Sequence, residues 1–486
     1  GQVAARCLRR QLLDLDTVLE EKVLGCKIGA FVDKHGWAAF RAAEALLLQD
    51  VLLGSFGVDD VASGCIVATG GGVIETPCAL EVLERHRHVI WVHRHIDDIL
   101  RTLEGVGSYR PGLGEHPSAI YERRRPLYER CSDFVFPMRR GDDAWPAIEE
   151  RFAHLVRWAD ADGEGVDASN MVCAPIVASS LEAALADIRE AAADGAGLVE
   201  LRLDKFAGGP QAVCENLPAL MAAARAHALV VLATFRPTWE DPSAGYSGED
   251  GPRFQALRRA SELGAAFVDV EHRAHAAWRA TGGLPLGSKT RLVVSSHNFQ
   301  GTLSLPELRA LGAEMRAAAG DQGVVKLAQM APDSLAAARM LSFRAEFPGP
   351  VIALTMGEAG TFVRLLAPRF PATVLTFGAL SGRASAPGQP TAVQMLRDFR
   401  LGAMTERTKV YALLCAEGGA AADRAAAVAA VVTAGMVAAG ADAVCIPVAL
   451  RGCTGEEFAR TAPSGLLAGW RQEDFAGLAG VPEEVA

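Results

Sequence analysis

Between residues 172 and 377 the chain repeats one pattern, a short apolar run followed by a longer stretch rich in Ala and Leu. Short apolar runs are typical of buried strands, and the longer stretches have the spacing of helices. The predicted strands are Val172–Val177, Gly197–Leu203, Leu229–Phe235, Ala266–Glu271, Leu292–Ser296, Val324–Met330, Val351–Met356 and Thr373–Phe377. The predicted helices include Leu181–Ala193, Leu217–His227, Phe254–Leu263, Leu305–Ala318 and Ser334–Phe343. Strands that alternate with helices in this way predict a (β/α)8 barrel at 171–400.

Two further α/β regions flank the predicted barrel. Residues 1–158 begin with a helix and a strand at Gln11–Asp16, and a small acidic stretch at 159–170 is typical of a linker. Residues 401–486 hold two apolar segments around an Ala-rich run, Ala425–Ala441. That run is weakly hydrophobic, so we expect a packed helix there and no membrane span.

Polar residues lie where most of the barrel strands end. Because catalytic groups of this fold gather at the carboxyl ends of the strands, they predict an active site at that rim. Glu200, Arg202 and Asp204 alternate along the second strand, and we expect all three to point into the barrel. The other candidates, in chain order, are Arg236, Glu240, His297, Lys326, Arg364, Ser385 and Gln389.

Lys326 stands out because it interrupts an uncharged strand. An ammonium flanked by Val325 and Leu327 is costly to bury, and burial lowers a lysine's pKa towards the neutral amine. A neutral amine is the nucleophile that forms a Schiff base with a ketone. The alternative is that Lys326 pairs with a carboxylate in the core and that His297 is a structural histidine.

Composition narrows the function classes. A net charge of -10 and a pI near 5.7 argue against a nucleic-acid partner. The ten cysteines are scattered without any C-x-x-C, and no signal-peptide pattern opens the chain, so a reducing, cytoplasmic location without membrane association is expected. The histidine pairs around 86–88 and 93–95 favour surface polar positions over a metal site.

The first region carries several ordered motifs: Asp14-Leu-Asp16, Phe40-Arg41 with Glu44, Ala68-Thr-Gly-Gly-Gly72, Arg110-Pro111 and Arg124-x-Pro-Leu-Tyr128. They resemble shikimate kinase, especially the kinase segment of the pentafunctional arom polypeptide, a P-loop-kinase-like parallel-sheet fold. The resemblance implies that Asp14 helps to hold Mg²⁺, that Arg110 binds the phosphates of ATP, and that the shikimate-binding residues are Asp16, Arg41, Gly70, Gly71, Gly72 and Arg124.

Phosphate transfer by this fold requires a G-x-x-x-x-G-K-[ST] loop, which cradles the nucleotide. The family places the loop before its first helix, and these 486 residues do not contain it. Gly287-Ser-Lys-Thr290 is a lookalike that precedes a strand instead of opening a helix. We therefore expect this polypeptide not to phosphorylate shikimate, with ATP and Mg²⁺ as cofactors of a complete kinase domain only.

The barrel motifs resemble type I 3-dehydroquinate dehydratase. They are Glu200-x-Arg-x-Asp204, Thr234-Phe-Arg236 with Glu240, Ser296-His-Asn-Phe299, Val325-Lys-Leu-Ala328, Met356-Gly357 through Arg364, and Ser385-Ala-Pro-Gly-Gln389. The resemblance implies a Schiff base between Lys326 and the C3 ketone of 3-dehydroquinate, His297 as the general acid and base, and Glu240 as its orienting residue. It also implies substrate binding by Glu200, Arg202, Arg236, Arg364, Ser385 and Gln389, without metal or organic cofactor.

The sequence departs from the dehydratase pattern at two places. Asp241-Pro242 stands where two glycines usually follow the glutamate, and Val363 stands where a serine usually precedes the arginine. Two other functions remain open: another Schiff-base barrel such as a class I aldolase, and a non-catalytic assembly module of a multienzyme. We further expect the chain to form a homodimer. We also expect it to work together with other domains of the shikimate pathway.

The last region resembles the start of shikimate dehydrogenase. Thr408-Lys-Val-Tyr-Ala-Leu-Leu414 is similar to its opening strand, and Gly440-Ala-Asp-Ala-Val-Cys-Ile-Pro447 is similar to its second. The Ser-x-Ser substrate motif is absent, because Ala416-Glu-Gly-Gly-Ala420 stands in its place. We therefore expect a partial or degenerate module without dehydrogenase activity.

Overall fold

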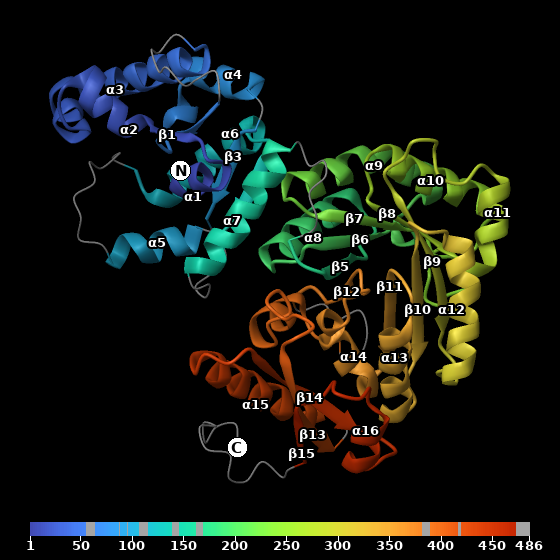
Figure 1. The fold of residues 1–486 in the computed structure, drawn as a ribbon. Coiled ribbons are helices and arrows are strands. Elements are labelled where there is room, and N and C mark those ends of the chain that lie inside the picture. The colour runs from blue at the N-terminus through green and yellow to red at the C-terminus, as the bar shows by residue number, and fades with distance from the viewer. Residues whose placement is uncertain are drawn as a thin grey trace. The chain divides into compact units, whose positions relative to one another are not determined.

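The computed structural model describes residues 1–54, 64–86, 88–94, 96–105, 115–138, 145–161, 169–381, 389–416 and 419–472. The chain divides into two compact units, the first covering residues 1–167 and the second nearly all of the remainder (Figure 1). Arg110 and Ser385 lie outside the described residues.

The first unit pairs its strands in parallel. In chain order its elements are α1 (Gln2–Leu8), β1 (Gln11–Asp14), α2 (Leu15–Val18), a π-helix (Leu19–Leu24), α3 (Ile28–Leu52), β2 (Cys65–Ala68), a 3-10 turn (Val73–Glu75), α4 (Pro77–Arg85), β3 (Ile90–His93), α5 (Ile96–Gly105), α6 (Pro117–Cys131), β4 (Phe134–Pro137) and α7 (Trp145–Asp160). Strand β1 pairs with β2, and β3 with β4, as two separate sheets among the described residues. Apolar residues of β1 pack with α3 and α4 in one core.

Two expected boundaries in this unit differ from the structure. The strand predicted at Gln11–Asp16 ends at Asp14, whose side chain accepts a hydrogen bond from the backbone N–H of Thr17 and so caps α2. Asp16 therefore lies in a helix, and the two acids do not share a strand face. The predicted linker also begins too early, because helix α7 continues through Asp160.

The second unit contains the predicted (β/α)8 barrel, which the structure confirms. Its eight parallel strands follow the chain: β5 (Val172–Ile176), β6 (Leu198–Arg202), β7 (Val230–Thr234), β8 (Phe267–Glu271), β9 (Arg291–Asn298), β10 (Val324–Met330), β11 (Val351–Met356) and β12 (Thr376–Phe377). Strand β12 pairs with β5, and Thr373, just before β12, bridges to Val351 of β11. The N–H of Val351 donates to Ala372 O at 2.9 Å, which closes the barrel.

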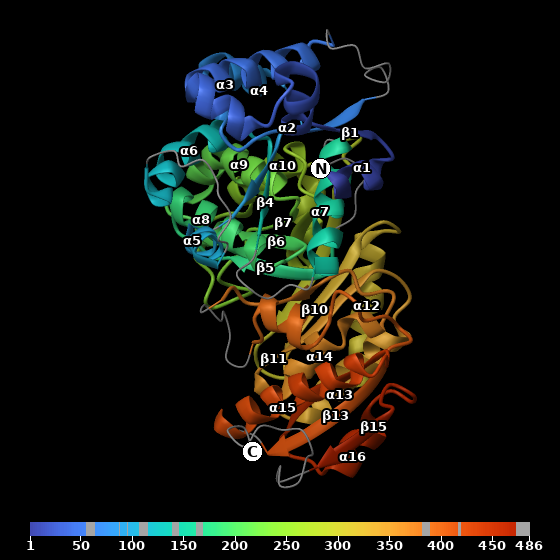
Figure 2. The same ribbon diagram turned by 90° about the vertical axis from the view of Figure 1, so that its left-hand side faces the viewer.

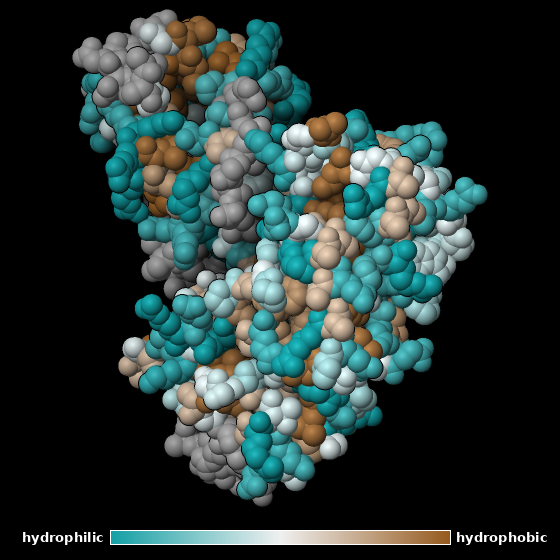
Figure 3. All heavy atoms as spheres, turned by 45° about the vertical axis from the view of Figure 1, so that its right-hand side comes forward, coloured by the Kyte–Doolittle hydropathy of each residue, from teal (hydrophilic) through white to brown (hydrophobic). Residues whose placement is uncertain are grey.

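Helices cover the outside of the strands, as α9 and α12 show in Figures 1 and 2. The barrel helices are α8 (Leu181–Ala193), α9 (Gly209–Ala226), α10 (Asp250–Glu262), α11 (His275–Ala280), α12 (Leu305–Ala319), α13 (Ser334–Glu346) and α14 (Thr361–Leu365). Apolar residues that alternate along the strands point outwards and pack against them in two large clusters. On the face shown in Figure 3, hydrophilic residues predominate and apolar ones form small separate groups.

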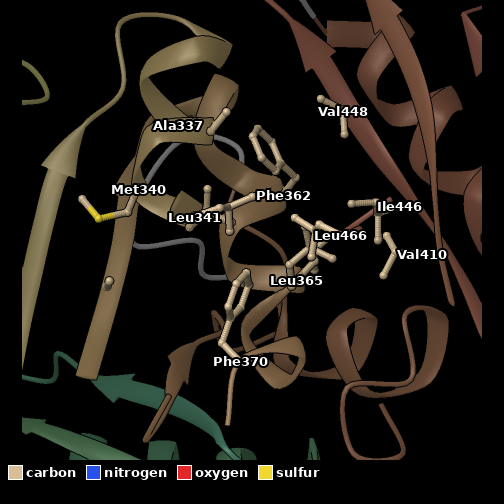
Figure 4. Packing of buried hydrophobic residues seen from close by; sticks show 14 of the residues in the cluster. Ala337, Met340, Leu341, Phe362, Leu365, Phe370, Val410, Ile446, Val448 and Leu466 are labelled. Carbon is tan, nitrogen blue, oxygen red and sulfur yellow. The ribbon is translucent and has the colours of Figure 1, made fainter. Parts of the chain in front are cut away.

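The C-terminal segment packs against the barrel within the same compact unit. It consists of β13 (Lys409–Ala416), α15 (Gly419–Ala438), β14 (Ala443–Leu450), α16 (Gly455–Thr461) and β15 (Gly469–Gln472), with the parallel strand order β14-β13-β15. Val410, Ile446 and Leu466 share one apolar cluster with barrel residues such as Leu341 and Leu365 (Figure 4). The C-terminal segment thus shares its apolar core with the barrel. The domain boundary predicted at residue 401 does not anticipate this shared core.

Polar contacts fix the same junction at the start of α13. The hydroxyl of Ser334 donates to Ala449 O at 2.9 Å and accepts the backbone N–H of Arg451 at 3.0 Å. Nearby, the rings of Phe362 on α14 and Phe458 on α16 meet edge to face at 5.2 Å. Helix α14 carries Arg364, so the C-terminal segment supports an element of the predicted site.

Helix α15 is the Ala-rich run for which a packed helix was expected. By length and composition Ala421–Ala438 is apolar enough to cross a membrane, with 22% of it buried. It is also the crossover between the parallel strands β13 and β14, and Ala425, Val428 and Ala429 are buried in the shared core. Because α15 connects two parallel strands and packs on them, its apolar residues have a place in the core.

Candidate active site

Lys326 lies at the centre of the barrel among carboxylates. Its side chain points inwards from β10, and its Nζ donates to Asp269 Oδ2 at 2.9 Å and to Glu200 Oε1 at 3.2 Å. The ring centroid of Phe377 lies 4.9 Å from Nζ. Val325 and Leu327 point to the other face and join the core beneath the helices. The sequence argument that apolar neighbours surround the amine is therefore wrong, because strand alternation separates Lys326 from both flanking residues.

His297 shares the interior face with Lys326. Strand β9 runs through Asn298, so His297 lies within the strand and not at its end. In the register between β9 and β10, Ser295 pairs with Lys326, and His297 pairs with Ala328. Residues two apart on a strand face the same side, so the imidazole lies one step nearer the carboxyl rim than the amine.

Glu240 holds His297 from the loop after β7. Its Oε1 accepts the backbone N–H of His297 at 2.7 Å and lies 3.2 Å from Nδ1. Burial, with the positive charges of Arg236 and Lys326, holds the pKa of His297 well below its usual value, so the imidazole is neutral and has a free nitrogen lone pair. Burial also raises the pKa of Glu240 to about 7, against the hydrogen bond from the His297 backbone. The pair thus has the geometry of a base and its orienting carboxylate.

The raised pKa of Glu240 predicts a pH dependence. Ionised Glu240 keeps the proton on Nδ1 and leaves Nε2 free to act as the base, whereas protonated Glu240 does not. We expect kcat/KM to fall as the pH is lowered through about 7. Glu240→Gln should remove this dependence and lower kcat/KM above pH 8 by about tenfold to a hundredfold, part of a general-base contribution. Steady-state profiles of both proteins test this, and an unchanged profile in the variant contradicts it.

A buried charge network, which the sequence motifs do not predict, lies around the amine. Arg236 binds Asp269 through Nη2 at 2.9 Å, and through Nη1 it binds Glu271 Oε1 at 2.7 Å and Ser295 Oγ at 2.9 Å. Glu271 in turn accepts from Arg253 Nη1 at 2.7 Å. Because both of its terminal nitrogens are bonded to protein groups, Arg236 is placed to hold Asp269 and Glu271 in position. The signal in the sequence was Phe-Val-Asp-Val-Glu271, a strand with acids on one face.

The second-strand motif is divided between two elements. Glu200 lies on β6, where it accepts the hydroxyl proton of Thr234 at 2.8 Å and faces Lys326. Arg202 ends the strand and binds Asp204 through two bonds of 2.8 and 2.9 Å. Asp204 follows in a 3-10 turn (Leu203–Lys205), so the expectation that all three side chains point inwards from one strand is wrong.

Arg364 is a buried cation on α14, which follows β11 after a 3-10 turn (Glu358–Gly360). Burial lowers its pKa to about 10, and among the described residues no carboxylate forms an ion pair with its guanidinium. A buried guanidinium of this kind suits the carboxylate of a small molecule, which it can bind through two parallel hydrogen bonds. Gln389 is half-buried just after the part of the chain that holds Ser385, so the roles predicted for these two residues stay predictions.

The first unit brings its predicted shikimate residues together. The register of β1 and β2 pairs Asp14 with Ala68, so the acids and the glycine turn follow adjacent strand ends. Arg41 binds Glu44 at 2.5 Å, and Arg124 binds Glu75 at 2.7 Å. The pKa values of Asp16 and Glu44 are raised, mainly by burial.

The glycine turn has a steric reason in this cluster. A Cβ at Gly70 would lie 2.6 Å from Glu44 Oε1, and one at Gly72 would lie 2.0 Å from Arg41 Nη2. The hydroxyl of Tyr128 donates to Gly71 O at 2.5 Å. The glycines of this turn therefore let the backbone and charged side chains meet closely.

These sites define the class of the protein: a (β/α)8-barrel enzyme with a lysine, a histidine and a glutamate at the barrel centre, preceded by an α/β unit. The family model for type I 3-dehydroquinase matches residues 172–404, and that for shikimate kinase matches residues 1–158. Over 220 residues the chain is 32% identical to 3-dehydroquinate dehydratase of Methanococcus vannielii, a match that covers 45% of this chain and 94% of that protein. The chain belongs to the type I 3-dehydroquinase family.

Two longer relatives combine several activities in their names. The chain is 35% identical over 247 residues to the bifunctional 3-dehydroquinate dehydratase/shikimate dehydrogenase of Arabidopsis thaliana, over 50% of this chain and 39% of that protein. It is 29% identical over 402 residues to the pentafunctional AROM polypeptide of Malassezia globosa, over 80% of this chain and 23% of that protein. The chain therefore spans well under half the length of both.

A solved structure gives a further comparison. The crystal structure of 3-dehydroquinate dehydratase from Geobacillus kaustophilus is 22% identical, with a TM-score of 0.41, and the match covers 48% of this chain and 95% of that one. Neither family match extends beyond residue 404, so the likeness of the C-terminal segment to shikimate dehydrogenase stays a prediction.

Proposed function

We propose that the second unit converts 3-dehydroquinate into 3-dehydroshikimate and water through a Schiff base on Lys326. The observation that carries the proposal is the placement of Lys326 and His297 on adjacent strands of one interior face. The amine first loses a proton, for which Glu200 at 3.2 Å is well placed. It then attacks the C3 carbonyl carbon, and the hydroxyl of the resulting carbinolamine leaves as water to give an iminium.

The iminium makes the proton on C2 acidic. His297 takes this proton, and the electrons of the C–H bond form an enamine with C3 and the nitrogen. The same imidazole returns a proton to the C1 hydroxyl, which leaves as water while the enamine electrons form the C1–C2 double bond. Water then hydrolyses the iminium and frees Lys326, so the water released on condensation is taken up again. Arg364 binds the substrate carboxylate throughout.

The intact chain tests the proposal directly. Incubation with 3-dehydroquinate should produce the conjugated enone of 3-dehydroshikimate, visible as a rising ultraviolet absorbance and as a product by chromatography. Addition of EDTA should leave the rate unchanged, since dehydratases of this type need no cofactor. Absence of product from folded protein contradicts the proposal, and turnover of other ketoses alone would favour an aldolase.

For the first unit we propose shikimate binding at Asp16, Arg41, Gly70–Gly72 and Arg124. The support is the close packing of Glu44 and Asp16 around Gly70. Mg²⁺ binding by Asp14, phosphate binding by Arg110 and the lack of ATP-dependent phosphate transfer remain predictions, as do the homodimer and the cytoplasmic location.

Gly70→Ala tests the shikimate site. The added Cβ would lie 2.6 Å from Glu44 Oε1 and 3.1 Å from Asp16 Oδ1, so one carboxylate must move. We expect calorimetric titration to show shikimate affinity at least about tenfold weaker than in the intact chain. Gly29→Ala is the matched control, since a Cβ there meets nothing within 4 Å. Equal affinity in Gly70→Ala, or no binding by the intact chain, contradicts the assignment.

A further inference from the structure

We propose that Asp269 is the fixed counter-ion of the cation that Lys326 carries through the reaction, and that it keeps the Schiff base protonated. This inference rests on the proposed function. It concerns a residue on β8 that the family motifs used above do not include, and it assigns different roles to the two carboxylates beside the amine.

The position of Asp269 is fixed by three donors. Its Oδ1 accepts the hydroxyl proton of Ser295 at 2.6 Å, and its Oδ2 accepts from Lys326 Nζ and from Arg236 Nη2, each at 2.9 Å. The side chain is fully buried. A carboxylate held in this way keeps its charge and cannot turn away when the amine reacts.

Glu200, the other carboxylate, is held much more loosely. It accepts from the Thr234 hydroxyl at 2.8 Å and from Lys326 at 3.2 Å, and among the described residues no arginine is hydrogen-bonded to it. Arg236 and Lys326, in contrast, hold the pKa of the Asp269 carboxyl far below its usual range, against the effect of burial. Asp269 is therefore suited to remain an anion beside the amine, whereas Glu200 has fewer partners that hold it in place.

The anion is anchored by a chain of alternating charges. From Lys326 it runs through Asp269, Arg236 and Glu271 to Arg253, and it ends at Asp250 on the first turn of α10. All of these side chains except Asp250 are buried. Buried ion pairs are costly to desolvate, and apolar residues can often replace them without loss of stability. This row of ion pairs is instead explained by its effect on the site, because it holds a fixed negative charge beside the amine.

Charge balance connects the network to the chemistry. The ammonium and the iminium of Lys326 both carry one positive charge, so either satisfies Asp269. The neutral imine would leave the buried carboxylate without one of its partners, which is costly in a site that excludes water. Asp269 therefore favours the protonated iminium, the form that withdraws electrons from C2. Among the described residues, Asp269, Glu200 and Phe377 contact Nζ from the surrounding strands, and Cys173 and His297 lie close enough to interact with Lys326 electrostatically.

Asp269→Asn tests the proposal because it removes the charge and keeps the shape. Borohydride reduces the iminium, so the rate of trapping with 3-dehydroquinate, measured against pH, reports the protonation of the Schiff base. We expect kcat to fall at least about a hundredfold, comparable to the loss of one preorganised electrostatic contact, and the trapping profile to shift to lower pH. Thermal unfolding of each variant checks that it is folded.

Glu271→Gln is the matched control. Glu271 is equally buried and also binds Arg236, but no hydrogen bond joins it to Lys326. We expect it to lower the unfolding temperature and to move the trapping profile much less than Asp269→Asn does. If Asp269→Asn does not fold, Ser295→Ala removes one hydrogen bond from Asp269 and should shift the profile in the same direction by a smaller amount.

The outcomes distinguish a failure of the counter-ion role of Asp269 from a failure of the proposed function. If the wild-type protein forms no trapped adduct, the proposed function fails. If the wild type is trapped and Asp269→Asn keeps both its kcat within threefold and its trapping profile, the counter-ion role is overturned. An equal shift in Glu271→Gln also overturns it, because the effect would then belong to the network as a whole.

Discussion

Replacing Lys326 with alanine is expected to lower the turnover of 3-dehydroquinate by about 10⁴-fold or more, the scale on which enzymes lose activity with their covalent nucleophile. The amine forms the bond that makes C2 acidic, and no second lysine is hydrogen-bonded to the described carboxylates around it. Initial rates of 3-dehydroshikimate formation measure the effect. Because the variant leaves Asp269 with one donor fewer, thermal unfolding should be measured in parallel.

Lys409→Ala is the control for this change. Lys409 is an exposed residue on β13, so its loss should leave turnover within about twofold, as for most surface substitutions. Substantial activity in folded Lys326→Ala would show that the reaction proceeds without an imine at this residue.

Replacing His297 with alanine should separate the two halves of the reaction. Proton removal from C2 loses its base, so we expect turnover to fall by about 10³- to 10⁴-fold. Imine formation does not require this imidazole, and borohydride should still trap an adduct on Lys326. The measurement is therefore a pair, initial rate and trapped fraction, on the same preparation.

His35→Ala provides the comparison, since His35 is exposed on α3 in the first unit. It should retain both rate and trapping. If His297→Ala lost the adduct together with the turnover, the imidazole would be needed for imine formation, and the assigned order of steps would be wrong. Full turnover in the variant would remove His297 from the mechanism.

The strands of the barrel could be predicted because a strand buried on both faces is a short, nearly continuous run of apolar residues. Val324–Met330 and Val351–Met356 were located to the residue, since a short, mostly apolar run between two helical stretches is typical of a buried parallel strand. The last strand was expected at Thr373–Phe377 but is divided: Thr373 bridges to β11, and Thr376–Phe377 pair with β5. Closure of a barrel is a property of the whole sheet and leaves no local signal.

The surroundings of Lys326 could not be deduced in the same way. Its flanking residues suggested an apolar site, but its neighbours come from β6, β8 and β12, which lie far away in the sequence. Only the closed arrangement of the barrel strands brings Asp269 and Glu200 to the amine. The pKa of a charged residue in a barrel strand therefore depends on the inward-facing charges of the other strands, and not on its neighbours in the sequence.

A helix cap and a 3-10 turn explain the other residues that were wrongly predicted to lie on a strand. Asp14 and Asp16 alternate as they would on a strand, yet capping of α2 by Asp14 turns the chain into a helix at Leu15. Arg202 and Asp204 are separated in the same manner by a 3-10 turn. In both cases a side-chain oxygen that can accept a backbone N–H or a guanidinium competed with the strand, and the competing interaction prevailed.

The most direct test of the central role of Lys326 is to find where the substrate becomes covalently attached. The intact chain is incubated with 3-dehydroquinate and borohydride, digested and analysed by mass spectrometry. We predict one modified peptide, with the reduced ligand on Lys326, and no adduct when borohydride or substrate is omitted. Attachment to another lysine, or unmodified protein after full turnover, would contradict the role given to this amine.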